Sequence, residues 1–410
     1  MCSPRELDIV LFGATGVTGA FVVEELQRAS EGLRWGVAGR NAGKMLATLR
    51  TVAANLGLEE NALDEVPLIV ADAEDEGSLL AMAQRTRLVL NTVGPYSFYG
   101  RQVVKACVRS GTHHIDISAE PQFMKQMEAE FHDEAREKGV LVLRACGFGS
   151  IPAEMCLSFL RQHFQGDLDR VESFLAIKEG PQGIKINFGT WQSIMHWLRN
   201  WSELMELMRH LPRRCILFRS EVAGGWCLPF PSSDRYVMNQ SDMLRQDLFG
   251  VKPVQINTYM RAPGFFTGLG LLLLGTIFGL LSLFSAGRWL LERFPGFFSA
   301  GKVKRGDLTR EQVLSCSFTM TMYGCGWKQN HALKSEHEVG KSKHSVTIRL
   351  EGPDPAYVTT ATCMVQVALV VLKELDRMPI KGGVLSPGVV LDSTSYVDRV
   401  EKRGIRMYVI

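Results

Sequence analysis

The 410-residue sequence lacks the features of several large functional classes. Its nine cysteines form no C-x-x-C pair and its nine histidines show no zinc-ligand spacing, so neither a metal site nor a disulfide framework is predicted. Lysine and arginine number 46 against 43 acidic residues, without a basic tract, which argues against a nucleic-acid partner. No basic leader precedes the first apolar run, so we expect no cleaved signal and reduced, intracellular thiols.

The most informative stretch that is present joins an apolar run at 9–12 to three glycines at three-residue spacing. The run is typical of a buried parallel strand, and helical periodicity begins after the glycines. Such a turn lets the backbone approach a pyrophosphate while the amides of the helix start point at it, although close helix packing alone also selects glycine. We predict a Rossmann-type dinucleotide site formed by Gly13, Ala14, Thr15, Gly16, Val17, Thr18 and Gly19.

The end of the second apolar stretch, at 34–40, predicts which dinucleotide is bound. The usual pattern places an acid about twenty residues after the turn, against the ribose 2′-hydroxyl. This chain has Arg40 at that place, and a guanidinium suits a 2′-phosphate that an acid would repel. NADP is therefore predicted as the cofactor in preference to NAD. The alternative is that Arg40 is a solvated surface charge.

Further strands alternate with helices and supply the other candidates. Asp72 ends one strand on the adenine side, although it could instead cap the next helix. Asn91, Val93 and Gly94 end another strand, and loops at the carboxyl ends of strands line the ligand crevice of a doubly wound sheet. We predict that these three residues, together with Tyr99, contact the nicotinamide side. The strands are expected at 66–72, 87–93, 112–121 and 139–143.

No positioned acid or base stands out, so the catalytic residues are unknown. The adjacent His113 and His114 would face opposite sides of a strand and receive no chemistry. Polar residues of the strand-end loops are candidates for the crevice, with loop capping as their alternative role: Tyr99, Ser118, Glu120 and Ser150.

The length suits two domains. We predict an α/β protein with a Rossmann-type doubly wound parallel sheet at 1–155, a second α/β domain at 156–390 with an apolar insertion, and a tail at 391–410 that packs back on the main body. The second domain is expected to hold strands at 171–177, 254–260, 315–323 and 344–350, a tryptophan-rich helix at 191–208, a basic loop at 211–214, a long helix at 357–375, a loop from 382 and a final strand within 404–410.

Motifs at 13–19, 38–40, 91–96, 115–121, 147–154 and 189–191 together carry a resemblance to the saccharopine dehydrogenase-like oxidoreductase family. The resemblance spans nearly the whole chain and implies an oxidoreductase with a Rossmann domain, a second α/β domain and no settled substrate. One departure is Gly149, because similar sequences carry aspartate there. The change removes a carboxylate from the loop that opens the second domain and puts an acid or base role of that loop in doubt.

The predicted function is NADP-dependent hydride transfer, with the redox chemistry residing in the cofactor. The resemblance implies two substrate classes: amino-acid-derived imines, or lipid enoyl groups as in the similar trans-acting enoyl reductases. The apolar insertion favours the lipid. The alternative, supported by Gly149, is a catalytically weak or inactive nucleotide-binding scaffold associated with membranes.

The apolar insertion covers 26 residues, 262–287, without a charged side chain. It is long enough to cross a bilayer, but a crossing would separate strands 254–260 and 315–323, which we expect in one sheet. We predict a glycine-bent helical hairpin in one leaflet, on the cytoplasmic face of the endoplasmic reticulum or on a lipid droplet. The alternative is a helix buried in a homodimer interface. The expected bends are Gly270, Gly275 and Gly279, and the expected head-group contacts are Arg288, Trp289 and Arg293.

Overall fold

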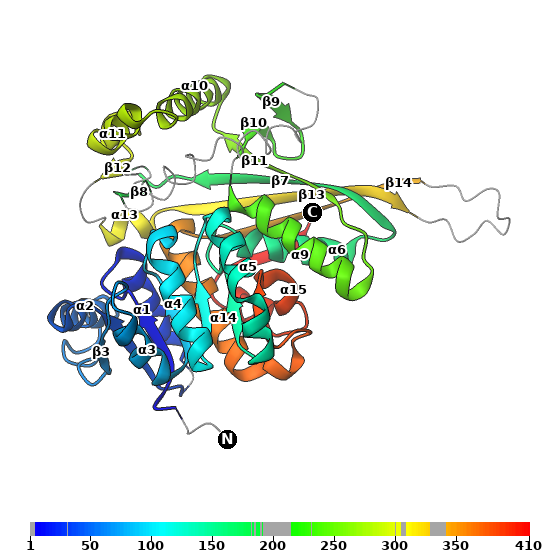
Figure 1. The fold of residues 1–410 in the computed structure, drawn as a ribbon. Coiled ribbons are helices and arrows are strands. Elements are labelled where there is room, and N and C mark those ends of the chain that lie inside the picture. The colour runs from blue at the N-terminus through cyan, green and yellow to red at the C-terminus, as the bar shows by residue number, and fades with distance from the viewer. Residues whose placement is uncertain are drawn as a thin grey trace. The chain divides into compact units, whose positions relative to one another are not determined.

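The computed structural model describes residues 5–30, 32–181, 183, 186–188, 191, 215–230, 232–299, 301–304, 309–328 and 342–410 (Figure 1). The chain divides into two compact units. The first unit combines Met1–Ile151 with Asp354–Arg403, and the second combines Pro152–Pro353 with Gly404–Ile410.

The first unit is built on a parallel sheet of seven strands, in the order β15-β6-β5-β4-β1-β2-β3. The central strand β1 pairs with β2 on one side and β4 on the other, so the strand order reverses there and the predicted doubly wound sheet is confirmed. The strands are β1 (Leu7–Phe12), β2 (Trp35–Gly39), β3 (Leu68–Val70), β4 (Thr86–Asn91), β5 (His113–Asp116), β6 (Leu141–Leu143) and β15 (Gly383–Leu385).

Helices pack on both faces of this sheet. Helix α1 contacts α2 and α14, while α4 contacts α3 and α5. Apolar side chains of β1 and β4 pack against α3 and α4 in one core cluster, and a second cluster joins α4 and α5 to β6 and β15. The helices are α1 (Val17–Ala29), α2 (Ala42–Asn55), α3 (Glu76–Gln84), α4 (Tyr96–Ser110), α5 (Pro121–Glu137), α14 (Thr360–Glu374), α15 (Pro387–Leu391) and α16 (Tyr396–Glu401).

The return of residues 354–403 to the first unit corrects two predictions. The second domain does not extend to 390, because α14 packs against α1, β4 and β5. Every residue from Thr360 to Val371 is buried, so this helix needs apolar neighbours on all sides. The predicted loop from 382 is also wrong, because Gly383–Leu385 forms the edge strand beside β6.

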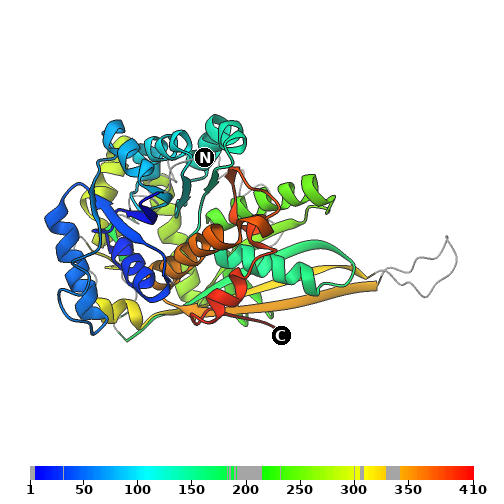
Figure 2. The same ribbon diagram turned by 90° about the horizontal axis from the view of Figure 1, so that it is seen from below.

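The second unit contains a mixed sheet of seven strands, in the order β16-β14-β13-β7-β11-β10-β9. Only the β7–β11 pair is parallel among the described strands of this sheet. The predicted final strand is β16, which lies alongside β14 (Figure 2). The strands are β7 (Asp167–Lys178), β9 (Phe218–Ser220), β10 (Gly225–Pro229), β11 (Gln255–Ala262), β13 (Ser317–Lys328), β14 (Ser342–Pro353) and β16 (Arg406–Val409).

Shorter elements complete the second unit. Strands β8 (Ile186–Asn187) and β12 (Val303–Lys304) pair in parallel, and the further helices are α6 (Ile151–His163), α9 (Ser233–Phe249) and α13 (Arg310–Leu314). Of the predicted motif at 189–191, helix at 191–208 and loop at 211–214, only Trp191 lies within the described residues. Its indole Nε1 donates to the Leu291 carbonyl at 3.2 Å.

The apolar insertion forms helices α10 (Phe265–Ser282) and α11 (Ser285–Arg293), followed by α12 (Pro295–Phe298). The predicted bends are wrong, because α10 continues through Gly270, Gly275 and Gly279. The chain turns instead between α10 and α11. Gly287 permits this turn, since a Cβ atom there would lie 2.1 Å from the Leu281 carbonyl oxygen.

Candidate dinucleotide site

Two glycines of the turn after β1 are required by the fold itself. Gly13 has φ +100°, and a Cβ atom there would lie 2.7 Å from the Thr92 hydroxyl oxygen. A Cβ atom at Gly19 would lie 2.2 Å from the Gly13 carbonyl oxygen, so only glycine lets α1 pack this closely on the turn. These two positions would be glycine with or without a ligand.

Gly16 has no such internal reason. Its φ of −77° suits any residue, and the nearest atom to a Cβ there would be the Gly13 carbonyl oxygen at an ordinary 3.4 Å. Gly16 and Thr15 are exposed, Ala14 is buried, and α1 begins at Val17 without a side-chain cap from any described residue. A Cβ atom would fill this open cradle of uncapped amides, which fits the pyrophosphate of a dinucleotide.

Arg40 and Asp72 follow β2 and β3 at the same edge of the sheet. Arg40 is exposed and makes no ion pair or side-chain hydrogen bond with any residue that the structure describes. The half-buried Asp72 accepts a hydrogen bond from the Glu74 amide at 3.1 Å. The alternative role of Asp72 as a helix cap is wrong, because Asp75 caps α3 by accepting from the Gly77 amide.

At the end of β4 and in the loop after it, some residues support the loop from the interior and others lie at the surface. The Asn91 side chain is fully buried and its Oδ1 accepts from the Val93 amide at 3.0 Å, so it shapes the loop from within. Val93 is half-buried and Gly94 is exposed. Sequence reasoning missed Thr92, whose hydroxyl donates to the Phe12 carbonyl at 3.1 Å and ties this loop to the end of β1. The sequence feature that could have identified Thr92 is its position between Asn91 and Val93, both of which were predicted as site residues.

Two buried carboxylates hold the neighbouring loops. Asp116 Oδ1 accepts from the Ser118 amide at 2.9 Å, the Ser118 hydroxyl at 2.7 Å and the Ala145 amide at 3.0 Å. Ala145 has φ +57°, an uncommon conformation for a residue with a side chain. The Glu120 carboxylate accepts from the Tyr96 and Ser97 amides at the start of α4, at 3.0 and 2.9 Å.

Two of the strand-end candidates for catalysis, Ser118 and Glu120, therefore hydrogen-bond to neighbouring loops and stabilise them. Ser118, Glu120 and Ser150 are buried, and the Ser150 hydroxyl donates to the Gly149 carbonyl. Tyr99 is half-buried and packs against one of the core clusters. Of this set, Tyr99 alone keeps substantial exposure among the described residues.

His113 and His114 support the sheet. The His113 Nδ1 atom accepts from the Leu141 amide at 3.0 Å, and burial lowers the pKa of His113 to about 4. Burial also lowers the pKa of His114, while Asp116 opposes that shift. In the described part of the chain, no group of three or more histidine, cysteine or acidic side chains could hold a metal ion.

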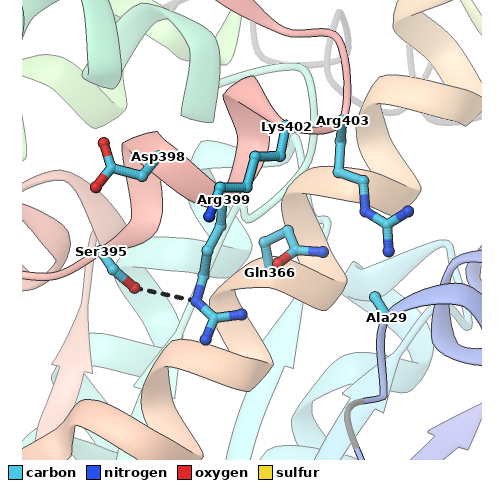
Figure 3. Close-up of a pocket in the computed structure, with 7 residues that line it drawn as sticks. All are labelled: Ala29, Gln366, Ser395, Asp398, Arg399, Lys402 and Arg403. Atoms are coloured by element: carbon cyan, nitrogen blue, oxygen red, sulfur yellow. Dashed lines mark hydrogen bonds between the residues drawn. The ribbon is translucent and has the colours of Figure 1, made fainter.

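A cavity of about 390 Å³ in the first unit is lined by Ala29, at the C-terminal end of α1, and by residues of α14 and the α16 region (Figure 3). Its two arginines are paired with acids: Arg403 Nε lies 3.1 Å from a Glu25 carboxylate oxygen, and Arg399 Nε lies 3.8 Å from a Glu374 carboxylate oxygen. None of the predicted cofactor residues lines it. The lining residues are Ala29, Gln366, Ser395, Asp398, Arg399, Lys402 and Arg403.

The parallel sheet and the open glycine turn at its centre define a dinucleotide-binding α/β protein. Residues 9–143 match the family described as the saccharopine dehydrogenase NADP binding domain. A human saccharopine dehydrogenase-like oxidoreductase is 35% identical, and the alignment covers 99% of this chain and 98% of that protein. The chain therefore belongs to the saccharopine dehydrogenase-like oxidoreductase family, which confirms the resemblance found in the sequence.

Two other similar proteins extend the comparison. The lipid droplet localized protein of Caenorhabditis elegans is 34% identical over 97% of each chain. The apo structure of the Saccharomyces cerevisiae saccharopine dehydrogenase (L-Glu forming) superposes with a TM-score of 0.54 at 15% identity, covering 98% of this chain and 100% of that one. At 15% identity, this structural similarity is evidence for the fold alone.

Proposed function

We propose that this protein is an NADP-dependent oxidoreductase that acts on a lipid-derived substrate at the cytoplasmic surface of a membrane or lipid droplet. The observation that carries the proposal is the open cradle at Gly16, which the internal packing of the unit does not require. The bound dinucleotide would supply the hydride chemistry. The chain's own amides at Val17 and Thr18 would hold the pyrophosphate, and the loop of Val93 and Gly94 would line the nicotinamide side.

Arg40 supports the choice of NADP. It follows β2 at the carboxyl edge of the sheet, where the ribose of a dinucleotide is bound in this class of fold. Because its guanidinium has no partner among the described residues, it is available to pair with a 2′-phosphate. An unphosphorylated ribose offers no charge to this side chain, so NADH is expected to bind more weakly.

The outer face of α10 supports a membrane partner. Only 22% of the α10 segment is buried, against 83% of the similarly apolar segment that contains α14. Phe266 is 84% exposed and Leu273 is 63% exposed. Exposed apolar patches of this kind mark interaction sites. We define the outer face of α10 as its exposed apolar residues that recur every three or four positions: Phe266, Leu269, Leu273, Ile277 and Leu280.

Attachment to one leaflet agrees better with the topology than a crossing. Strands β11 and β13, which flank the insertion, both belong to the sheet of the second unit. A helix of 18 residues rises about 27 Å, close to the thickness of the hydrocarbon core, but its two ends return to the same sheet. Further exposed aromatic side chains suited to an interface follow at Trp289 on α11, Phe294 between α11 and α12, and Phe297 on α12.

The lipid-derived substrate follows from this location. An enzyme held at a lipid surface meets substrates that partition there, and the C. elegans relative is named for lipid droplet localisation. The competing proposal is a nucleotide-binding scaffold without turnover. It is favoured by Gly149 and by the burial of Ser118, Glu120 and Ser150.

A fluorescence titration with NADPH, followed by a turnover screen, tests the catalytic part. We expect NADPH binding and oxidation with lipid enoyl thioesters, and none with water-soluble imines. Binding without oxidation of NADPH by enoyl thioesters, aldehydes or imines would favour the scaffold. Absence of dinucleotide binding would contradict both proposals.

Flotation with phosphatidylcholine vesicles tests the membrane part. Leu273→Glu should reduce the bound fraction more than about tenfold, because it places a charge in the apolar contact. Val70→Glu is the matched control, since Val70 of β3 is also 63% exposed but lies in the first unit. If the wild-type protein stays unbound and elutes as a dimer that Leu273→Glu dissociates, the outer face is a dimer interface instead.

A further inference from the structure

Helix α4 takes its N-terminal cap from a distant loop. The residue before the helix is Pro95, which has no polar side chain to accept from the first amides. Glu120, at the end of the loop after β5, fills this role. One of its carboxylate oxygens accepts from the Tyr96 amide and the other from the Ser97 amide. A negative charge at a helix N-terminus also interacts favourably with the helix dipole.

The helix start that Glu120 holds is connected to the proposed nicotinamide loop. The Tyr96 hydroxyl donates to the Asn91 carbonyl at 3.0 Å, and burial raises the pKa of Tyr96, which keeps it a donor. The Asn91 side chain in turn accepts from the Val93 amide. The Thr92 hydroxyl lies 3.1 Å from the Phe12 carbonyl oxygen and 3.2 Å from the Gly13 carbonyl oxygen and shares its one proton between them, so the same loop is joined to the glycine turn.

We propose that Glu120 is the positioning residue of the nicotinamide half of the site. This inference rests on the proposed dinucleotide function. Glu120 is 5% exposed, and its two carboxylate oxygens accept hydrogen bonds from the Tyr96 and Ser97 amides. It therefore holds the loop at 91–97 from the interior of the unit. Charge-assisted bonds to two successive amides restrain the backbone more strongly than neutral ones. Loss of the carboxylate would let the loop that includes Val93 and Gly94 vary in conformation, and a bound nicotinamide ring would lose a fixed neighbour.

If Glu120 only stabilised the fold, its loss would weaken binding of both halves of the cofactor. Binding of the adenine half alone can therefore distinguish this role from a positioning role. The fragment 2′,5′-ADP contains the adenine half and the 2′-phosphate, and it lacks the nicotinamide. It therefore reports on the glycine turn and Arg40, while NADPH reports on the whole site. A general loss of structure would weaken both ligands, whereas a displaced loop at 91–97 would weaken NADPH alone.

The experiment measures both dissociation constants for the full chain and its variants. Glu120→Gln is nearly isosteric but places an amide donor against one of the two N–H groups. We expect it to weaken NADPH about tenfold and to leave 2′,5′-ADP within about twofold of wild type. Glu120→Asp keeps the charge on a shorter side chain and should recover part of the affinity. Glu137→Gln, an exposed position on α5, is the control and should change neither constant.

Three results would overturn the inference. One is equal weakening of both ligands by Glu120→Gln, which would make the residue structural. Another is a wild type that binds NADPH and a Glu120→Gln variant that binds it equally well. That result would exclude a positioning role for Glu120 while the proposed function stands. The third is a wild type that binds neither NADPH nor 2′,5′-ADP, in which case the proposed function and the inference fail together.

Discussion

The carboxyl edge of the first sheet and the outer face of α10 depart from a simple globular pattern in opposite ways. At the carboxyl edge, polar groups such as Asp116 and Glu120 are buried but accept bonds from neighbouring loops. On α10, large apolar side chains such as Leu273 are exposed without cover. In the first region nearly every polar group has a partner within the fold. Gly16 and Arg40 are the exceptions, because no packing requires the glycine and no described residue pairs with the arginine, and they are the basis of the proposed ligand site. The fold does not account for the exposed apolar side chains of the second region, and this exposure is the basis of the proposed membrane contact.

The largest expected effect contrasts one side chain from each region. Asp116→Ala leaves three buried donors without an acceptor and should lower the unfolding free energy by about 3 kcal/mol. Leu273→Ala removes an exposed side chain and should change it by less than about 0.5 kcal/mol. Urea unfolding monitored by circular dichroism measures both. Equal effects would mean that Leu273 is covered in the protein as it exists in solution.

The glycine turn separates a folding role from a ligand role. Gly19→Ala forces α1 away from Gly13 and should cost about 2 kcal/mol of stability. Gly16→Ala meets no atom closer than 3.4 Å, so its thermal unfolding should match wild type while NADPH binding weakens strongly. Calorimetric melting and NADPH titration of the pair check this. Unchanged binding by Gly16→Ala would mean that the cradle holds no phosphate.

Cofactor preference should depend on the exposed guanidinium of Arg40. We expect the wild type to prefer NADPH over NADH by about 2 kcal/mol, the order of a hydrogen bond to a charged group. Arg40→Asp should reverse the preference, and Arg40→Met, which loses the charge and the N–H donors but keeps an unbranched side chain, should abolish it. Competitive titrations measure the ratio. Equal wild-type affinities for the two cofactors would make Arg40 a solvated surface charge.

A pH-dependent effect on stability is expected from Asp234 on α9. Burial raises the pKa of Asp234 to about 7, so the native state retains a proton that the unfolded state has released. The contribution of Asp234 to stability should therefore be full below about pH 4 and fall as pH rises toward 7, by about 1.4 kcal/mol per pH unit between these values. Asp234→Asn should flatten that part of the profile, and the exposed Asp247→Asn should not. A profile unchanged by Asp234→Asn would show that the group is not protonated when folded.

Regular spacing was the strongest guide to the fold. The apolar runs that became β1, β2 and β4 to β6, and the glycine spacing after β1, were predicted because neighbouring residues alone determine them. The three-residue strand β15 was missed because a Gly-Gly pair beside a short apolar run is also typical of a loop. Only pairing with β6, far away in the chain, makes it a strand.

The candidate site was predicted in part for the same reason. The turn of Gly13, Gly16 and Gly19 and the position of Arg40 follow from local order along the chain. Sequence spacing could not show that Asn91 points inward or that Glu120 caps α4, since both depend on side-chain directions set by neighbouring strands. Asp72 was weighed as a helix cap, but the helix begins four residues later, after Asp75.

The sequence by itself determined the family, the nucleotide strand and its glycine turn, and the charge-free length of 262–287, since each is a property of consecutive residues. The tertiary structure decided which glycine has no internal role, which carboxylate caps which helix, and that residues 354–403 complete the first unit. It also decided that α10 continues unbroken through its glycines and leaves large apolar side chains exposed. These outcomes depend on contacts between segments distant in the chain, and local spacing carries no information about such contacts.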